Sequence, residues 1–187
     1  MTERTRRAQP SKLPRVYLRP PTRADRDEFL ANNRASRRHF RGLASPMLSP
    51  EAFAAYLVRS RRSDCVCLLV CRHEDQAIAG CVNISQIVRG PFQSAYMGYQ
   101  VFAPYASQGF MSAAMPLVLR HLFGPLKLHR IEANVQPGNV ASIALVRRAG
   151  FRLEGCSPRY LKVAGRWRDH ERWALTVEDW KGTRRRT

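Results

Sequence analysis

The sequence has few acidic residues and no long apolar run. Its 187 residues include 32 Lys and Arg but only 14 Asp and Glu, which gives a formal net charge of +18. No segment approaches the roughly 18 consecutive apolar residues that a membrane-spanning helix needs. The basic N-terminus is not followed by the apolar stretch of a secretory signal. We therefore expect a cytoplasmic protein that does not contact a membrane.

The cysteines lack the spacing that a metal site would require. They are five, an odd number, at positions 65, 67, 71, 81 and 156, and no zinc-type pattern connects them. A disulfide framework is typical of secreted chains instead. Three of the cysteines fall in the apolar segment 65–71, so we interpret them as small buried side chains of a strand. We expect no bound metal.

The excess of positive charge favours an anionic partner, which would be the phosphates of a cofactor, a nucleic acid, or both. A solvated basic face is the alternative. Part of the charge lies at the two ends, so we divide the chain into a basic flexible tail (1–14), one domain (15–180) and a basic C-terminal tail (181–187). No aromatic-basic RNA motif is present, and RNA binding is therefore supported by charge alone.

Apolar periodicity alternates between strand and helix along the chain. This order predicts a single α/β domain with a mixed sheet and helices on both sides. Pro116 falls inside one expected helix, where it should cause a kink or a shortening because it has no N–H to donate. The expected strands cover 16–19, 65–71, 77–87, 94–102, 128–135, 151–159 and 172–177; the expected helices cover 23–34, a segment beginning at 49, 107–123 and 139–149.

Two segments have the pattern of a strand that leads into a helix. The first, 98–111, passes through a turn that contains Gly109, and the second, 129–151, passes a Gln-Pro-Gly turn into a helix opened by Asn139. A helix N-terminus after a glycine turn binds phosphate, because its free N–H groups and the positive end of its dipole point at the anion.

These segments resemble the Gcn5-related N-acetyltransferases, in which such a turn holds the pyrophosphate of acetyl-coenzyme A. Gly109 keeps the last position of that family's turn, whereas Ser107 replaces its first glycine and Pro104 stands where Arg or Gln is usual. Further blocks, at 82–85, 88–92, 96–99, 129–131 and 165–170, resemble the ribosomal-protein-alanine N-acetyltransferases of the RimJ type. The resemblance covers about residues 15–180 and implies a centrally splayed sheet.

The resemblance also implies a binding site for acetyl-coenzyme A. Asn139 and Ser142 should reach the pantetheine and the sulfur, although both also suit the first turn of a helix. Arg147 is a candidate for the adenosine phosphate, or else lies on a solvated helix face. The expected binding residues are Val101, Phe102 and Ala103 through their backbone, the loop and helix residues Ser107, Gln108, Gly109, Phe110 and Met111, and Asn139, Ser142 and Arg147.

Proton transfer is the least defined part of the expected site. Glu132 is the only carboxylate between Ala77 and Ala149, so it is the candidate general base, unless it forms an ion pair with an arginine. Many relatives carry a tyrosine that acts as the general acid at the position that holds Val146 here. This leaves Tyr160 as the candidate acid, unless its ring only contributes to packing. The resemblance implies that Ser142 lies near the sulfur of the cofactor, which makes it a third catalytic candidate.

We interpret the chain as an acetyl-coenzyme A-dependent enzyme that acetylates the N-terminal α-amine of a protein, with a ribosomal protein as the substrate that the resemblance implies. An α-amine has a pKa near 8 and needs little catalytic help at neutral pH. Acetylation of a small amine or antibiotic is an alternative. The other alternative is a ribosome- or RNA-binding module without catalytic activity.

Overall fold

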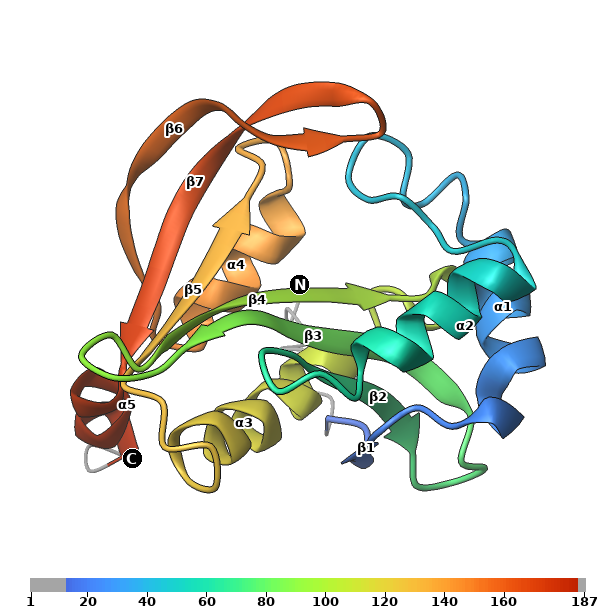
Figure 1. The fold of residues 1–187 in the computed structure, drawn as a ribbon, viewed down its shortest axis with the longest axis horizontal. Coiled ribbons are helices and arrows are strands. Elements are labelled where there is room, and N and C mark those ends of the chain that lie inside the picture. The colour runs from blue at the N-terminus through green and yellow to red at the C-terminus, as the bar shows by residue number, and fades with distance from the viewer. Residues whose placement is uncertain (1–12, 185–187) are drawn as a thin grey trace, which may run out of the picture.

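The computed structural model describes residues 13–184; residues 1–12 and 185–187 of the two expected tails lie outside the described part. One seven-stranded mixed sheet runs in the order β1-β2-β3-β4-β5-β7-β6, with helices on both faces (Figure 1), which confirms the predicted fold class. The strands are β1 (Val16–Arg19), β2 (Val66–Arg72), β3 (Ile78–Val88), β4 (Ser94–Val101), β5 (Arg130–Val135), β6 (Arg152–Val163) and β7 (Arg166–Thr176). The helices are α1 (Arg26–Ala35), α2 (Pro50–Arg59), α3 (Phe110–Phe123), α4 (Val140–Arg148) and α5 (Val177–Arg184), with short 3-10 turns η1 (Arg23–Asp25) and η2 (Ala103–Tyr105).

The hairpin of β6 and β7 is longer than the sequence pattern predicted. The two strands continue to a turn at Ala164 and Gly165, which have φ values of 48° and 81°. Residues 159–168 are mostly exposed and rich in Arg and Lys, so they show no alternation of apolar and polar positions that would mark a strand. Only the hydrogen-bonded pairing of the two strands across the hairpin identifies these residues as strand residues.

Helix α3 differs from the prediction at both its start and its middle. It begins at Phe110 rather than at residue 107, because Ser107 and Gly109 have φ values of 60° and 83° and keep the preceding loop out of the helix. A serine in this region costs on the order of 1 kcal/mol. The helix continues through Pro116 to Phe123. Pro116 lies on the exposed face, where water can hydrogen-bond to the carbonyl that loses its N–H partner.

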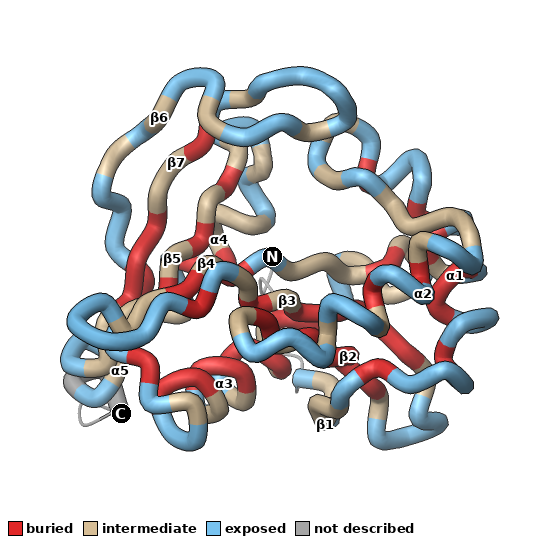
Figure 2. The backbone as a smooth tube through the Cα atoms, viewed as in Figure 1, coloured by how far each residue is buried: buried red, intermediate tan, exposed pale blue. Residues whose placement is uncertain are grey.

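Two groups of buried side chains attach the helices to opposite faces of the sheet (Figure 2). Helices α3 and α4 pack on one face, against residues such as Ile131. Helices α1 and α2 pack on the other face of β2 and β3 through an aromatic cluster, in which the ring of Phe29 lies 5.3 Å from that of Phe53 and 5.5 Å from that of Phe102. In Figure 1, β5, β7 and β6 rise away from α1 and α2, so this second face opens toward the middle of the sheet.

The sheet splits between β4 and β5. These parallel strands pair only at Ser94–Arg130, Ala95–Ile131 and Tyr96–Glu132. Beyond that point β4 stays paired with β3 and β5 stays paired with β7, so each half of the sheet remains intact while the gap between them widens. This confirms the central splay, and it leaves the backbone groups on one edge of β4 without a strand partner.

We expect Gly80 to be required where β3 packs on β4. A Cβ at this position would lie 2.3 Å from the backbone oxygen of Gln100, whereas a Cβ at Gly98 would meet no atom within 4 Å. Gly80→Ala should lower the free energy of unfolding by about 1–3 kcal/mol, and Gly98→Ala should change it by less than about 0.5 kcal/mol. Urea denaturation of the two variants tests this, and equal losses would contradict it.

Candidate active site at the splayed strands

Two pockets meet where β4 and β5 separate. The helix-side pocket, of about 430 Å³, lies between β4, the N-terminus of α3 and α4. The hairpin-side pocket, of about 290 Å³, lies on the opposite face of the sheet and is bordered by β5 and the β6–β7 hairpin. Both are lined by Leu43, Ala44, Tyr99, Gln100, Asn139 and Ser142. A molecule in one pocket can therefore approach a molecule in the other through the gap.

The edge of β4 supplies backbone groups to this gap. The N–H of Phe102 donates to the oxygen of Ala79 at 2.9 Å, and in an antiparallel pair every second residue has its backbone groups turned away from the partner strand. The groups of Val101 and Tyr99 therefore point toward the gap. The expected donor Ala103 instead donates its N–H to Oγ of Ser36 at 2.8 Å, so of the three predicted strand residues Val101 has its amide directed to the gap.

The loop before α3 has the form of a phosphate site. Ser107, Gly109, Phe110 and Met111 all line the helix-side pocket. The amides in the first turn of α3 have no partner within the helix, and the positive end of its dipole faces the same space. Gln108 is placed differently, because its side chain folds back and donates to the oxygen of Pro104 at 2.8 Å.

Helix α4 turns one face toward the helix-side pocket. Asn139 caps the helix by accepting a hydrogen bond from the N–H of Ser142 at 3.2 Å. Arg148 lines the pocket, whereas the guanidinium of Arg147 lies 5.6 Å from the ring centroid of Trp173. The helical spacing of Ala141, Ser142, Leu145 and Arg148 was the signal that distinguishes Arg148 from its neighbour.

Tyr99 is a residue of this site that the sequence reasoning did not single out. Its hydroxyl lies 2.6 Å from Oγ of Ser142, at a point that both pockets share. Burial raises the pKa of Tyr99 to about 12, so the phenol keeps its proton at neutral pH. The signal was available, because Tyr99 ends one of the blocks that carry the family resemblance.

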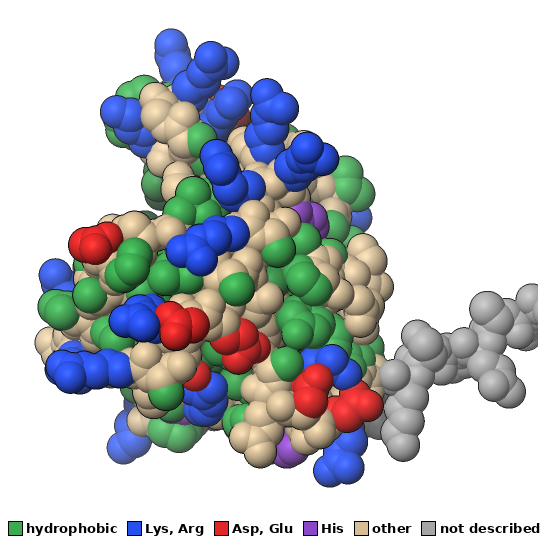
Figure 3. Space-filling view, turned by 90° about the vertical axis from the view of Figure 1, so that its right-hand side faces the viewer, with side chains coloured by type: hydrophobic (Ala, Val, Ile, Leu, Met, Phe, Trp, Pro, Cys, Tyr) green, Lys and Arg blue, Asp and Glu red, His purple; other side chains and the backbone are tan. Residues whose placement is uncertain are grey.

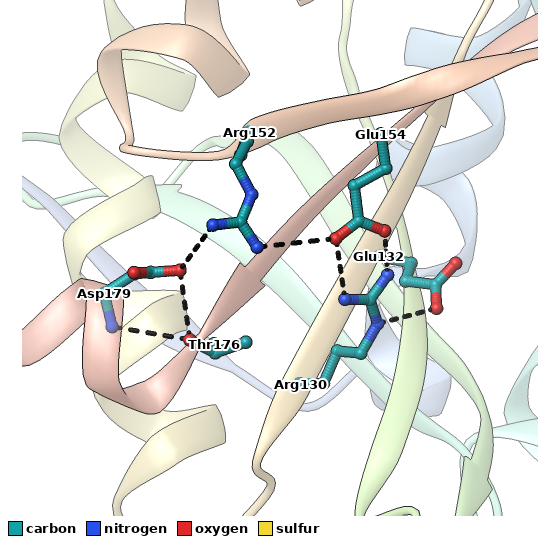
Figure 4. Close-up of polar contacts among 6 residues, drawn as sticks. All are labelled: Arg130, Glu132, Arg152, Glu154, Thr176 and Asp179. Atoms are coloured by element: carbon teal, nitrogen blue, oxygen red, sulfur yellow. Dashed lines mark hydrogen bonds and ion pairs between the residues drawn. The ribbon is translucent and has the colours of Figure 1, made fainter.

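Glu132 belongs to a network of charges beside the gap (Figure 4). Nε of Arg130 donates to Oε1 of Glu132 at 2.9 Å, and the same guanidinium binds both carboxylate oxygens of Glu154. That hydrogen bond from Arg130 holds the pKa of Glu154 below its ordinary value. Glu132 sits at the last paired position of β5, and it does not line either pocket. Its role as a base stays a prediction.

Tyr160 lies on the hairpin side of the gap. Its ring centroid is 6.4 Å from that of His170, and its hydrogen bond to Tyr96, together with partial burial, raises the pKa of Tyr96. Unlike Ser142, with which the sequence grouped it as a catalytic candidate, Tyr160 lines neither pocket. Its role as an acid also stays a prediction.

The hairpin-side pocket is polar but carries no carboxylate among its lining residues. Asn83 of β3, Asn134 of β5 and His170 of β7 line it, and the Oδ1 atoms of both asparagines are buried without a hydrogen-bond partner in the described structure. Sequence reasoning did not assign a role to these residues. The blocks at 82–85 and 165–170 contain two of them, whereas only the register of β5 brings Asn134 to the same place.

Basic side chains surround the entrance on the side of the hairpin. Figure 3 shows Lys and Arg gathered along the upper edge of this face, while the acidic side chains lie lower. The exposed basic residues of the 36–48 segment and of residues 159–168 of the hairpin, here called the basic rim, are Arg37, Arg38, Arg41, Arg159, Lys162 and Arg166.

The described residues contain no cluster of three or more His, Cys, Asp or Glu side chains that would hold a metal ion. Four cysteines are buried and free, and burial raises the pKa of Cys81 to about 12, which suits a packing role. Among residues 13–184, no helix has the length and apolar character needed to cross a membrane.

Comparison with known proteins places this geometry in a family. The model of the acetyltransferase (GNAT) domain matches residues 15–152. The probable N-acetyltransferase YjcK of Bacillus subtilis is 39% identical over 56% of this chain and 58% of its own length. The alanine N-acetyltransferase of ribosomal protein uS5 from Escherichia coli is 38% identical over 57% of this chain and 55% of its own. The chain thus spans a little over half the length of these curated relatives.

Solved structures agree. RimJ of Mycobacterium smegmatis in complex with CoA-disulfide superposes with a TM-score of 0.79 at 30% identity, over 88% of this chain and 83% of that one. The spermidine N-acetyltransferase of Vibrio cholerae in complex with CoA and spermine reaches a TM-score of 0.77 at 20% identity, over 89% of this chain and 98% of that one, which shows the fold alone. Because the family model matches well over half of the sequence, the protein belongs to the GNAT acetyltransferase family.

Proposed function

We propose that the protein is an acetyl-coenzyme A-dependent N-acetyltransferase whose acceptor is the N-terminal α-amine of a ribosomal protein. The observation that carries this proposal is the passage between the two pockets at the splayed strands. A thioester held on the helix side would present its carbonyl at the gap, where an amine on the hairpin side can attack it. Acetyl-coenzyme A supplies the activated acyl group.

The helix-side pocket has the groups that this co-substrate needs. The first-turn amides of α3 and the turn at Gly109 can take its pyrophosphate, and Arg148 adds a cation on the opposite wall. The free backbone edge at Val101 and Tyr99 can pair with the peptide-like pantetheine, and an amide there can polarise the thioester carbonyl. Tyr99, whose hydroxyl lies 2.6 Å from Oγ of Ser142, can serve as the proton donor for the departing sulfur.

The hairpin-side pocket supports an α-amine as the acceptor in preference to a polyamine. A polycation would need carboxylates to bind its ammonium groups, and the lining residues include none. The basic rim would also repel it. An α-amine has a pKa near 8, so a useful fraction is neutral at pH 7. Relatives that act on ribosomal protein uS5 support the choice of a ribosomal protein.

The basic rim also favours contact with ribosomal RNA while the enzyme is at work. The same surface would serve a non-catalytic RNA-binding module, which is the rival from another class. A small amine or an antibiotic is the rival acceptor within the enzymes, and the modest volume of the hairpin-side pocket, about 290 Å³, would accommodate one. The assays below separate these possibilities.

Gly109→Glu should abolish binding of acetyl-coenzyme A. The new side chain would start at φ 83°, 3.1 Å from Leu13, and would bring negative charge to the pyrophosphate. Ligand at about 100 times its Kd should stabilise the wild type by about 2.7 kcal/mol, and this gain should vanish in the variant. Differential scanning fluorimetry measures it, with Gly90→Glu, another positive-φ glycine with open space around it, as the control. Equal shifts in wild type and Gly109→Glu would contradict the phosphate site.

Tyr99→Phe should lower kcat by about 100-fold, the lower end of general-acid effects, without changing the Kd of acetyl-coenzyme A. The phenol has a pKa of about 12, so the wild type should show no loss of activity from Tyr99 ionisation up to about pH 9. Tyr17→Phe, on β1, serves as the control. Stopped-flow measurement of thiol release checks the rate, and an unchanged kcat would remove Tyr99 from the chemistry.

A panel of acceptors should show selectivity for a free N-terminus. Purified protein should release thiol with a peptide that has a free α-amine, and should act poorly on the same peptide when it is N-blocked but contains lysine, and on spermidine. A preference for spermidine would contradict the choice of acceptor. Salt-sensitive RNA binding with no turnover on any amine would favour the binding module instead.

A further inference from the structure

A buried histidine without an assigned role lines the hairpin-side pocket. His170 is only 3% exposed and lines this pocket. Its Nδ1 lies 3.0 Å from the backbone oxygen of Arg168. Because a carbonyl can only accept a hydrogen bond, Nδ1 carries a proton, and Nε2 is the ring nitrogen left to act as an acceptor. The residues described give Nε2 no hydrogen-bond partner.

Two oxygens of the same pocket lack donors. Oδ1 of Asn83 and Oδ1 of Asn134 are buried and have no partner in the described part of the chain, although both side chains line the pocket. A buried acceptor without a donor costs about 1–3 kcal/mol. Since Asn83 and Asn134 lie on the two halves of the split sheet, a ligand between the halves can supply N–H groups to both. An amine carries such groups.

We propose that Asn83, Asn134 and His170 form the subsite of the attacking amine: the two amide oxygens accept its N–H groups, and Nε2 of His170 accepts its proton. This inference rests on the proposed acetyl transfer. A bond forms between the amine nitrogen and the thioester carbon, and the C–S bond breaks with its electron pair on sulfur. Before the attack, the incoming α-ammonium gives one proton to Nε2, which passes it to water. After the attack, the nitrogen loses its second proton to water, while sulfur takes a proton from Tyr99 and Tyr99 regains one from water.

The geometry favours His170 over Glu132 for this task. Glu132 is engaged by Arg130 at 2.9 Å and lies two residues before Asn134, about 6.6 Å along the strand. Its carboxylate thus points into the ion-pair network of Figure 4, whereas His170 lines the pocket itself.

The surroundings of His170 define the class of amine. Titratable and charged groups on the elements around it are Tyr160 of β6, Tyr96 of β4, Glu132 of β5, and Arg168 and Arg172 of β7. The Nε atoms of these two arginines are buried without partners in the described residues. Asp169 and Glu171 also lie on β7, but at the alternate positions, which point to the other face of the sheet. The charges of β7 that share a face with His170 are therefore those of arginines, so the subsite suits a single amine, such as a peptide N-terminus, and disfavours a polycation.

His170→Asn is the sharpest test. The Nδ2 of asparagine can still donate to the oxygen of Arg168, but the variant has no base at the position of Nε2. We expect its melting temperature and its Kd for acetyl-coenzyme A to match the wild type, and its kcat/KM for an N-terminal peptide to fall about 10-fold at pH 7, because about a tenth of an α-amine with a pKa near 8 is already neutral there. The loss should shrink above about pH 9, where the α-amine is already neutral. His129→Asn, at an exposed histidine paired with Glu178, is the matched control.

Full activity in a folded His170→Asn would overturn the proposal, as would a pH-dependent loss in Glu132→Gln but not in His170→Asn. If the variant does not fold, the wild type is assayed with two peptides whose α-amines differ in pKa. If the apparent pKa on the acidic side of the kcat/KM profile changes with the pKa of the peptide, the proposal is overturned. If that apparent pKa is the same for both peptides, and Asn134→Leu raises KM, the proposal is supported. A wild type that is inactive on every amine would contradict the proposed function itself.

Discussion

The loss of pairing between β4 and β5 is the constraint on which the site depends. Three paired positions hold the strands together at one end, and the remaining residues of β4 stay in place only because β3 still binds them on the other side. The gap opens the sheet without breaking it. Backbone groups that would form hydrogen bonds in a continuous sheet are free to bind a ligand. The pockets on the two faces of the sheet are connected through the gap.

Charge is distributed around this gap in a consistent way. Two carboxylates beside it, Glu132 and Glu154, are held by Arg130, and the lining of the hairpin-side pocket carries amides and a histidine. The arginines of the rim lie in solvent, where each ion costs little. An uncharged pocket with a positive entrance favours an acidic or neutral partner over a polycation.

The sequence predicted the glycine turn, the asparagine cap and the helices beside the helix-side pocket because their signals are local. A glycine turn before a helix, an asparagine cap and helical spacing each act within a few residues of the chain, and the structure has them at Gly109, Asn139 and the exposed face of α4. The prediction was less successful where the face of an element mattered. Arg147 turns to Trp173 while Arg148 faces the pocket, and only counting the helical period from Ala141 separates the two.

The sequence by itself determined the α/β class, the order of strands and helices up to β7, the family resemblance and the glycine turn before α3, because each follows from periodicity or from neighbouring residues. Tertiary structure alone decided which polar groups share a pocket. Asn83, Asn134 and His170 are separated by about half of the chain and come together through strand order and register, and a shift of one residue in any of these strands would turn the side chain to the other face. The tertiary structure also decided the charge network around Glu132, because the β6–β7 hairpin brings Glu154 to Arg130, the partner of Glu132.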